Sequence, residues 1–169
     1  LSFTGTYRQQ WAGLPGAPTG QRLSVHMPLY FLRGGFGLQV ENDEIGAHRL
    51  SGVQGAYNFQ MEMGSGVLSL GVGAGWQQWT LNGRDLITPE GTYSEPGNFT
   101  HNDDLLTLNT EAGSGLQLNT GVYYQTERFD LGFSVENISR TSYQLTRFNY
   151  STVPTYNAFA EARFELSRT

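Results

Sequence analysis

Residues 52–79 read GVQGAYNFQMEMGSGVLSLGVGAGWQQW, and apolar and polar or small residues alternate along them with a period of two. This period is typical of a β-strand, whose successive side chains point to opposite faces. The apolar faces of the two runs carry Val53, Gly55, Tyr57, Phe59, Met61 and Met63, and then Leu68, Leu70, Val72, Ala74 and Trp76. Because residues 64–66 read Gly-Ser-Gly, the stretch predicts two long strands joined by a tight hairpin turn.

The same alternation recurs along the chain, and no segment shows a convincing helical period. Residues 116–135 predict a second hairpin with its turn at 126–128. Weaker strands are predicted at residues 2–10, 21–27, 35–41 and 156–166. The pattern therefore predicts about eight antiparallel strands in an all-β fold, with residues 1–169 forming one domain.

The predicted connections are of two kinds. The two hairpin turns are short, whereas residues 11–19, 42–50, 80–113 and 139–155 are long and contain the Pro, Asn and Asp typical of irregular backbone. The longest, residues 80–113, carries six acidic residues and a single Arg. A loop of this length is unusual in a compact soluble domain, but it is ordinary on the outward side of an outer-membrane barrel.

Composition excludes several classes of function. The 169 residues include 22 Gly and 22 aromatic residues, whereas charged residues make up only 15%. The net charge of −5, without any run of Lys or Arg, argues against nucleic-acid binding, which needs a clustered positive surface. The absence of Cys excludes disulfides, thiolate nucleophiles and Cys-ligated metal centres. The sequence also predicts no signal peptide and no transmembrane helix, because it has neither a basic and apolar leader nor 18 uninterrupted apolar residues.

These features favour an antiparallel transmembrane β-barrel. Tilted strands of about ten residues cross a bilayer, with apolar side chains facing lipid and polar ones facing the lumen. A soluble barrel or sandwich with its apolar face inward is the alternative, because periodicity alone does not say which face meets lipid. Aromatic residues near strand ends predict girdles at the membrane interfaces. They are Tyr7, Trp11, Tyr30, Phe31, Trp76, Trp79, Tyr123, Tyr124 and Phe129.

Several segments, in order along most of the chain, resemble the PorP/SprF family of Bacteroidota outer-membrane proteins. They are GTYRQQWAGLPGAP at residues 5–18, QRLSVHMPL at 21–29, GFGLQVENDEIG at 35–46, LSLGVGAG at 68–75, GVYY at 121–124 and FDLGFSVEN at 129–137. Proteins of that family accompany type IX secretion and gliding motility. They are usually longer than this chain, so the resemblance implies a single β-barrel domain or a fragment of a larger barrel.

The resemblance implies a non-enzymatic outer-membrane component that helps cargo proteins reach or stay on the cell surface. The implied partners are membrane lipid, a secreted cargo protein and periplasmic or outer-membrane components of the secretion machine. Because strands are committed to lipid and lumen, the loops are the expected contact surface. The candidate partner-binding residues are Trp11, Pro15, Pro18, Arg84, Asp85, Asp103 and Asp104. A diffusion pore is the alternative, and an outer-membrane lipid-modifying enzyme is less favoured.

Other site chemistries have simpler explanations, and we predict no catalytic residue, metal site or cofactor. A serine esterase could combine Ser24 or Ser69 with His26, His48 or His101, but hydrogen bonding in the lumen accounts for Ser24 and His26. Residues 113–115 (Gly-Ser-Gly) are predicted as a turn rather than a nucleophile elbow.

Charged residues of the predicted loops and last strand have similarly simple roles. Asp103, Asp104 and Glu111 could hold calcium, although their spacing matches no EF-hand and a solvated acidic loop explains them better. The last predicted strand carries Glu161, Arg163 and Glu165, which could form lumenal ion pairs with Arg22 or Arg33 or line a pore.

Overall fold

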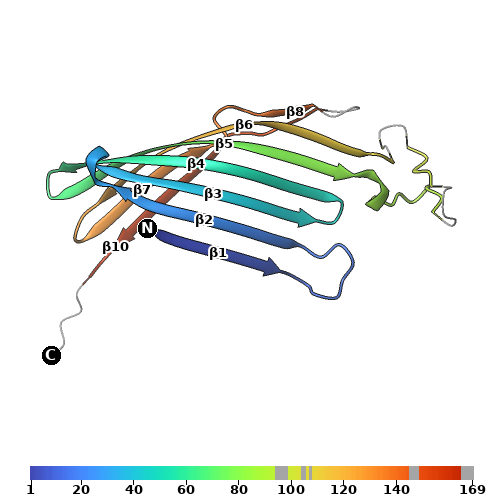
Figure 1. Ribbon diagram of the computed structural model, residues 1–169, viewed down its shortest axis with the longest axis horizontal. Helices are drawn as coiled ribbons and strands as arrows, with labels where there is room; N and C mark the ends of the chain where they lie inside the picture. The colour runs from blue at the N-terminus through green and yellow to red at the C-terminus, as the bar shows by residue number, and fades with distance from the viewer. Residues whose placement is uncertain (94–98, 104–105, 107, 145–148, 165–169) are drawn as a thin grey trace.

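A computed structural model describes residues 1–93, 99–103, 106, 108–144 and 149–164. Eight antiparallel strands form one sheet, and two short strands form a separate hairpin (Figure 1). The sheet comprises β1 (Ser2–Gln9), β2 (Thr19–Leu29), β3 (Gly34–Ile45), β4 (His48–Met63), β5 (Gly66–Asn82), β6 (Thr110–Gln125), β7 (Phe129–Glu136) and β10 (Thr155–Ala162). The hairpin comprises β8 (Ser142–Gln144) and β9 (Asn149–Ser151), and two 3₁₀ turns are η1 (Tyr30–Leu32) and η2 (Gly83–Asp85). Among these residues, no helix is long and apolar enough to cross a membrane.

The hairpin predicted from residues 52–79 is confirmed. β4 and β5 pair antiparallel from Met63 and Gly66 beside the turn to His48 and Leu81 at the far end. The second predicted hairpin is also confirmed, because β6 pairs with β7 across residues 126–128. β6 nevertheless begins at Thr110, so residues 113–115 lie within a strand and their prediction as a turn was wrong.

The connections differ at the two ends of the sheet. At the end that we call the turn end, residues 30–33, 64–65 and 126–128 join the strands. At the opposite end, which we call the loop end, residues 10–18, 83–109 and 137–154 make long connections (Figure 1). Three of the four predicted long connections therefore lie at the same end of the sheet.

The fourth predicted long connection, residues 42–50, was wrong. β3 continues to Ile45 and β4 begins at His48, leaving a tight turn at residues 46–47. Polar residues in this region pair across the strands: the Ser51 hydroxyl donates to Asn42 Oδ1 over 2.7 Å, and Arg49 Nη2 lies 2.7 Å from Glu44 Oε2. The polarity that suggested a loop therefore belongs to cross-strand pairs.

Apolar side chains of the sheet lie on its outer face. In β5, Leu70, Val72 and Trp76 are 44%, 60% and 53% exposed, whereas the alternate residues line the concave inner side. Among the described residues, the only buried hydrophobic side chains are Leu81 and Tyr143. A water-soluble fold needs a buried apolar core to offset the entropy of folding. The alternative of a soluble fold with its apolar face inward is therefore wrong.

The apolar rows end before the strands do. On β5 the outward apolar run extends from Leu68 to Trp76, about the nine to eleven residues that a tilted strand needs to cross a bilayer. Closer to the loop end, the outward rows become polar. The polar outward residues there are Gln21, Asn42, Glu44, Arg49, Ser51, Gln78 and Ser114. The strands therefore extend beyond the apolar band at the loop end.

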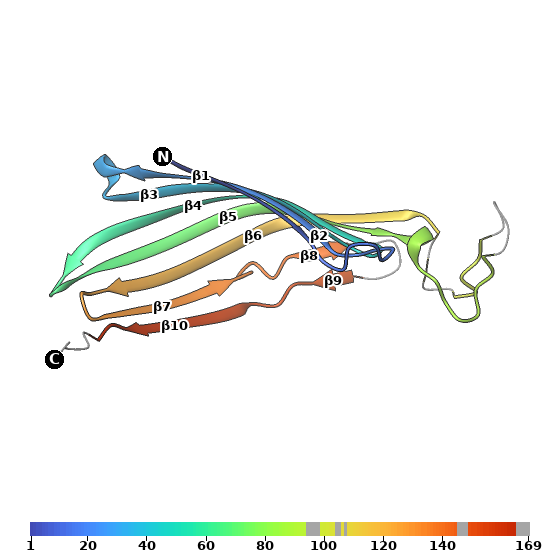
Figure 2. The same cartoon turned by 90° about the horizontal axis from the view of Figure 1, so that it is seen from below.

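The sheet is strongly curved but is not closed. β1 and β10 are its two edges, and no pairing joins them within the described part of the chain. Figure 2 shows the curvature, with the strands following one another around a concave inner side. Not all the aromatic residues predicted for girdles face outward: the register places Trp79 and Tyr123 on the inner face.

The outer face gives a direct test of which side meets lipid. Val72→Arg should destabilise the folded protein in a bilayer by about 2–4 kcal/mol, the cost of Arg on the lipid face near the midplane. Asn58→Arg is the matched control, because Asn58 lies on the inner face of the neighbouring strand at a similar depth. Unfolding in lipid vesicles measures both changes, and equal tolerance of the two variants would contradict an outward apolar face.

Candidate functional site

The first loop, residues 10–18, is held against the neighbouring hairpin. Gln10 N donates to Pro18 O over 2.9 Å, and Gly46 N in the β3–β4 turn donates to Gly16 O over 3.0 Å. Trp11 adopts a left-handed backbone with a φ of 51° and is 70% exposed. The loop is therefore braced at its base while it presents an aromatic side chain to the surroundings.

Among the predicted contact residues of this loop, exposure differs. Pro15 is exposed, whereas Pro18 is buried where the chain enters β2. Pro18 therefore helps fix the loop base, because its ring restricts φ, and offers no surface to a partner.

The second loop, residues 83–109, carries the other predicted contact residues. Arg84 and Asp85 are exposed in η2, where Asn82 Nδ2 donates to Asp85 Oδ2 over 2.6 Å. Asp103 is exposed farther along, and Asp104 lies outside the described residues. The structure thus places Arg84, Asp85 and Asp103 at the loop end, although it does not gather them into one cluster with the first loop.

Part of the second loop has a defined internal framework that the sequence did not suggest. Thr92 and Thr100 form an antiparallel bridge. The Tyr93 hydroxyl lies 2.9 Å from Nδ1 of His101, which is buried, and it accepts a hydrogen bond from the Thr88 amide over 2.8 Å. The described part of the loop around Tyr93 and His101 therefore has a defined fold.

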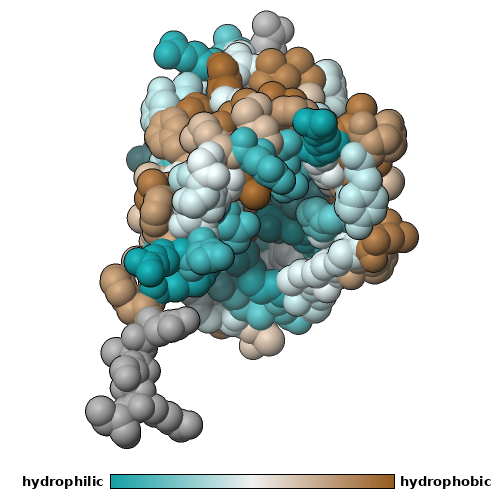
Figure 3. Space-filling model, turned by 90° about the vertical axis from the view of Figure 1, so that its left-hand side faces the viewer, coloured by the Kyte–Doolittle hydropathy of each residue, from teal (hydrophilic) through white to brown (hydrophobic). Residues whose placement is uncertain are grey.

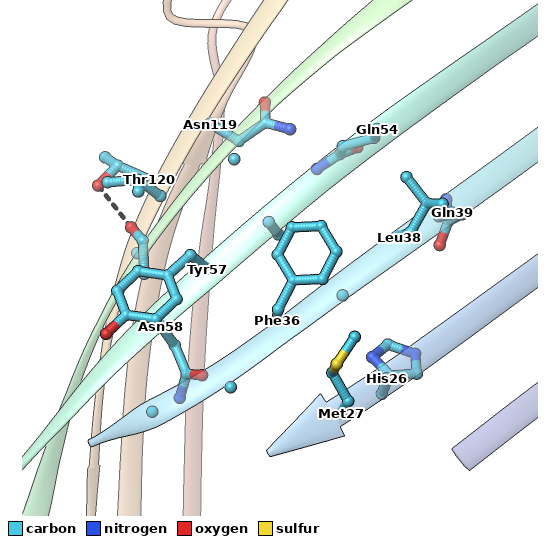
Figure 4. A pocket seen from close by; sticks show the side chains of 18 of the residues that line it. His26, Met27, Phe36, Leu38, Gln39, Gln54, Tyr57, Asn58, Asn119 and Thr120 are labelled. Atoms are coloured by element: carbon cyan, nitrogen blue, oxygen red, sulfur yellow. Dashed lines mark hydrogen bonds between the residues drawn. The ribbon is translucent and has the colours of Figure 1, made fainter. Parts of the chain in front are cut away.

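The concave inner face of the sheet contains a groove of about 780 Å³. Its polar lining comes from several strands, and Figure 4 shows these side chains around the space. The lining includes His26, Gln39, Gln54, Asn58, Asn119 and Ser134. Seen from the turn end, the molecule is hollow, with hydrophilic residues inside and hydrophobic residues around the outside (Figure 3). Met27, Phe36, Leu38 and Tyr57 also line the space, so the groove combines neutral, hydrogen-bonding groups with apolar ones.

Glycines on the inner face leave space for long polar side chains to lie along the wall. A Cβ at Gly73 would lie 3.0 Å from Gln54 Nε2, and a Cβ at Gly37 would lie 3.1 Å from His26 Nδ1. These contacts show that Gln54 and His26 extend over neighbouring glycines. The alternation of small and long residues thus keeps the groove open.

The β8–β9 hairpin, within the predicted loop 139–155, lies over the inner face near the loop end. Pairing of β7 with β6 reaches only Val135 and Thr120, after which Asn137 and Arg140 adopt left-handed φ values of 57° and 47°. The Ser139 hydroxyl then donates to the Leu116 carbonyl over 2.9 Å. After β7, the chain therefore leaves the sheet and turns toward its inner face.

Aromatic rings hold this hairpin against the inner wall. Tyr143 and Tyr150 stack with ring centroids 6.0 Å apart, Tyr150 stacks on Trp79 at the same distance, and His48 lies 5.2 Å from Trp79. Tyr143 is 1% exposed, and its hydroxyl donates to Gln77 Oε1 over 2.9 Å. Burial raises the pKa of the Tyr143 hydroxyl, so the group remains protonated as a hydrogen-bond donor.

Ion pairs on the inner face differ from those predicted. Arg22 pairs with Glu41 over 3.2 Å. Arg163 contacts Asp130 and Glu161, and the Tyr123 hydroxyl also donates to Asp130 over 2.8 Å. The predicted pairing of Glu161 with Arg22 was therefore wrong.

The other two charged residues of that prediction are Arg33, which forms no ion pair with another described residue, and Glu165. Arg33 lies at the turn end, where its left-handed backbone ends η1. Glu165 is outside the described residues.

The residues considered for catalysis are not brought together. His26 lines the groove, His48 lies beside Trp79, and His101 belongs to the second loop. Ser24 is buried on β2, and Ser69 lies on β5 near the turn end. The three histidines thus lie in separate environments, and Ser24 and His26, although both on the inner face of β2, are not joined by a hydrogen bond within the described residues.

The residues considered for calcium differ in burial. Glu111 is buried on β6, whereas Asp103 is exposed in the second loop. Asp104 was not described, and no group of three or more potential metal ligands was found within the described ranges.

The whole chain matches one protein family. Residues 1–169 match the family described as type IX secretion system membrane protein PorP/SprF. Neither a curated protein nor a solved structure matches the chain. The match covers every strand of the sheet and both loops, and it confirms the resemblance found in the sequence segments.

The Arg163–Asp130 contact provides a test of how the last strand is held. Arg163→Ala should lower the stability of the folded protein, because it leaves the buried Asp130 carboxylate without its cationic partner. Arg49→Ala is the control, since it removes an exposed pair with Glu44 that is worth about 0–1 kcal/mol. Denaturant unfolding compares the two, and an equal or smaller loss for Arg163→Ala would contradict a structural role.

Proposed function

Because the chain belongs to the PorP/SprF family of type IX secretion system membrane proteins, we propose that it is an outer-membrane accessory or anchoring component. Its role is to help particular cargo proteins reach or stay on the cell surface during type IX secretion or gliding. The family match establishes a membrane β-barrel of this secretion system. The cargo role is supported by the arrangement of loops around the barrel.

The observation that carries the proposal is the difference between the two ends of the sheet. The three long connections emerge at the loop end, whereas the turn end has only short ones (Figure 1). Outer-membrane barrels place their longer loops outside and their short turns in the periplasm. The loop end therefore faces the surface and meets cargo, and the turn end faces periplasmic components.

Lipid contacts the outer apolar band, and Trp11 lies beyond that band. The outward row turns polar at Gln21 on β2 and at Gln9 on β1, beyond Tyr7, and the first loop follows on the loop-end side. Trp11 and Leu14, which are 70% and 63% exposed, are therefore available to a protein partner. A large aromatic side chain on a braced loop is a typical anchor of protein interfaces.

The second loop gives the surface its charge. Asp85 and Asp103 are exposed, and residues 80–113 carry six acidic residues against one Arg. Such a surface attracts a basic partner, with faster association at low salt because ions screen exposed charges. The internal framework around Tyr93 and His101 holds part of the loop in a defined shape.

At the turn end, a smaller surface fits a periplasmic partner. Tyr30 and Phe31 in η1 are 86% and 81% exposed. Their backbone is fixed by the hydrogen bond from Arg33 N to Tyr30 O, and the Tyr57 hydroxyl donates to Leu32 O over 2.6 Å. Periplasmic components of the secretion machine would contact this braced apolar turn.

Deleting residues 86–98 should preserve folding and membrane insertion but reduce surface display of cargo. The deletion removes much of the second loop while leaving β5 and β6 intact. Surface-exposed cargo is measured on whole cells, and heat-modifiable migration of the purified protein reports folding. A variant with Glu127→Gln and Arg128→Ala, which changes exposed charges at the turn end, is the control and should leave display unchanged.

One result would replace docking with conduction through the barrel. This result is that deletion of residues 86–98 leaves secretion and surface attachment of cargo unchanged, while substitutions of Gly71, Gly73 and Gln77 on the inner face abolish both. The groove that Gly71 and Gly73 line favours this second function.

A further inference from the structure

We propose that the β8–β9 hairpin is an internal plug that closes the loop end of the lumen. Once the gap between the edge strands β1 and β10 is closed in the membrane, the groove beneath the hairpin is reached from the turn end and not from the loop end. This inference does not depend on the docking role of the loops, because it concerns the inner face alone. It would make the lumen a one-ended site for an uncharged, hydrogen-bonding guest.

The hairpin crosses the inner wall rather than lying at its edge. Tyr143 hydrogen-bonds Gln77 of β5, and Tyr150 stacks on Trp79 of the same strand. Trp79 in turn contacts His48 of β4. We call Tyr143, Tyr150, Trp79 and His48 the aromatic chain. Together with the packing of β8 on β6, it extends over β4, β5 and β6 at the loop end.

The wall is shaped to receive the hairpin. A Cβ at Gly113 would lie 2.8 Å from Tyr143 Cβ, and one at Gly115 would overlap Thr141 Cγ2. Both glycines lie on the inner face of β6, so any larger residue would push the hairpin toward the lumen axis. Close backbone approach is a recognised reason for glycine within a strand.

The space on the two sides of the hairpin differs. The groove of about 780 Å³ lies along the middle and turn-end parts of the inner face, reaching Gly34 and Gln60. The hollow is visible from the turn end (Figure 3). A separate cavity of about 410 Å³ at the loop end is bounded by Tyr143, Tyr150 and Trp79 themselves. The aromatic chain thus stands between the groove and the loop-end surroundings.

The lining of the groove indicates what it would accept. Gln54 and Asn58 extend from β4 over neighbouring glycines, and no side-chain hydrogen bond is found for either within the described part of the chain. Their amide groups can both donate and accept hydrogen bonds. Among the described residues that line the groove, Glu136 is the only acidic one and none is Arg, while Phe36, Leu38 and Tyr57 add apolar surface, so an uncharged guest with both polar and apolar groups fits better than an ion.

The absence of Cys from the sequence allows single-cysteine accessibility to test the plug. Gly71→Cys is the reporter: Gly71 lines the groove, and the nearest atom to a Cβ there is Gly121 O at 3.8 Å. Leu14→Cys and Glu127→Cys mark the loop end and the turn end, because both residues are exposed. The full chain is reconstituted in lipid vesicles, and a sulfonated fluorescent maleimide is applied to one side at a time.

We expect the Gly71→Cys reporter to be labelled from the side that labels Glu127→Cys and not from the side that labels Leu14→Cys. Adding Gly115→Val to the reporter displaces the hairpin and should bring labelling from the loop end. Gly5→Val is the matched control, because a Cβ there meets only Leu23 Cδ1 at 3.8 Å on the outer face. This control should leave the one-sided labelling unchanged.

A second variant tests the same point if the Gly115→Val protein does not fold. Tyr143→Ala with Tyr150→Ala removes two rings of the aromatic chain without touching the sheet, and it should also bring labelling from the loop end. Labelling of the unmodified reporter from the loop end would overturn the proposal. Folded hairpin variants that keep one-sided labelling would overturn it as well.

Discussion

The whole structure depends on the requirement that strands in lipid pair every backbone group with a neighbouring strand while turning apolar side chains outward. The period of two then assigns each residue to lipid or lumen, and a shift by one residue would reverse the assignment. Val72 and Gly73 illustrate the outcome: the first is exposed on the outer face and the second lies beneath Gln54 on the inner face. Most apolar side chains therefore lie on the outer surface, and the inner face is largely polar.

A protein without an apolar interior must hold its inner face together by other means. Here hydrogen bonds and ion pairs do so, as between Arg22 and Glu41 or between Arg163 and Asp130. Near the loop end, the aromatic chain of the β8–β9 hairpin adds packing that the sheet alone lacks. The inner face is consequently hollow toward the turn end and partly filled at the loop end.

Features that follow from local periodicity were predicted correctly from the sequence. Predictions failed where contacts between residues far apart in the chain determine the structure. The two main hairpins and the outward apolar rows follow from alternation within a few residues. Residues 42–50 were mistaken for a loop because Asn42 and Asp43 are typical of irregular backbone, although Asn42 accepts a hydrogen bond from Ser51 across the two strands. The inward hairpin was missed because its partners, Gln77 and Trp79, lie far along the chain. Gly113 and Gly115 were a signal for it, since two inner glycines in a strand can mark close approach.

The three tryptophans offer the most direct measurement of the central claim, that the apolar rows face lipid while the inner face is shielded from it. Trp76 is exposed on the outer face, and Trp79 lies three residues later on the inner face beneath Tyr150. Variants that retain only one of these two tryptophans, with the others changed to Phe, are refolded into vesicles whose lipids carry bromine near the ester end of the acyl chains. The account predicts that the bromines quench the fluorescence of Trp76 and leave that of Trp79 nearly unchanged. Equal quenching of both tryptophans, or quenching of Trp79 alone, would contradict it.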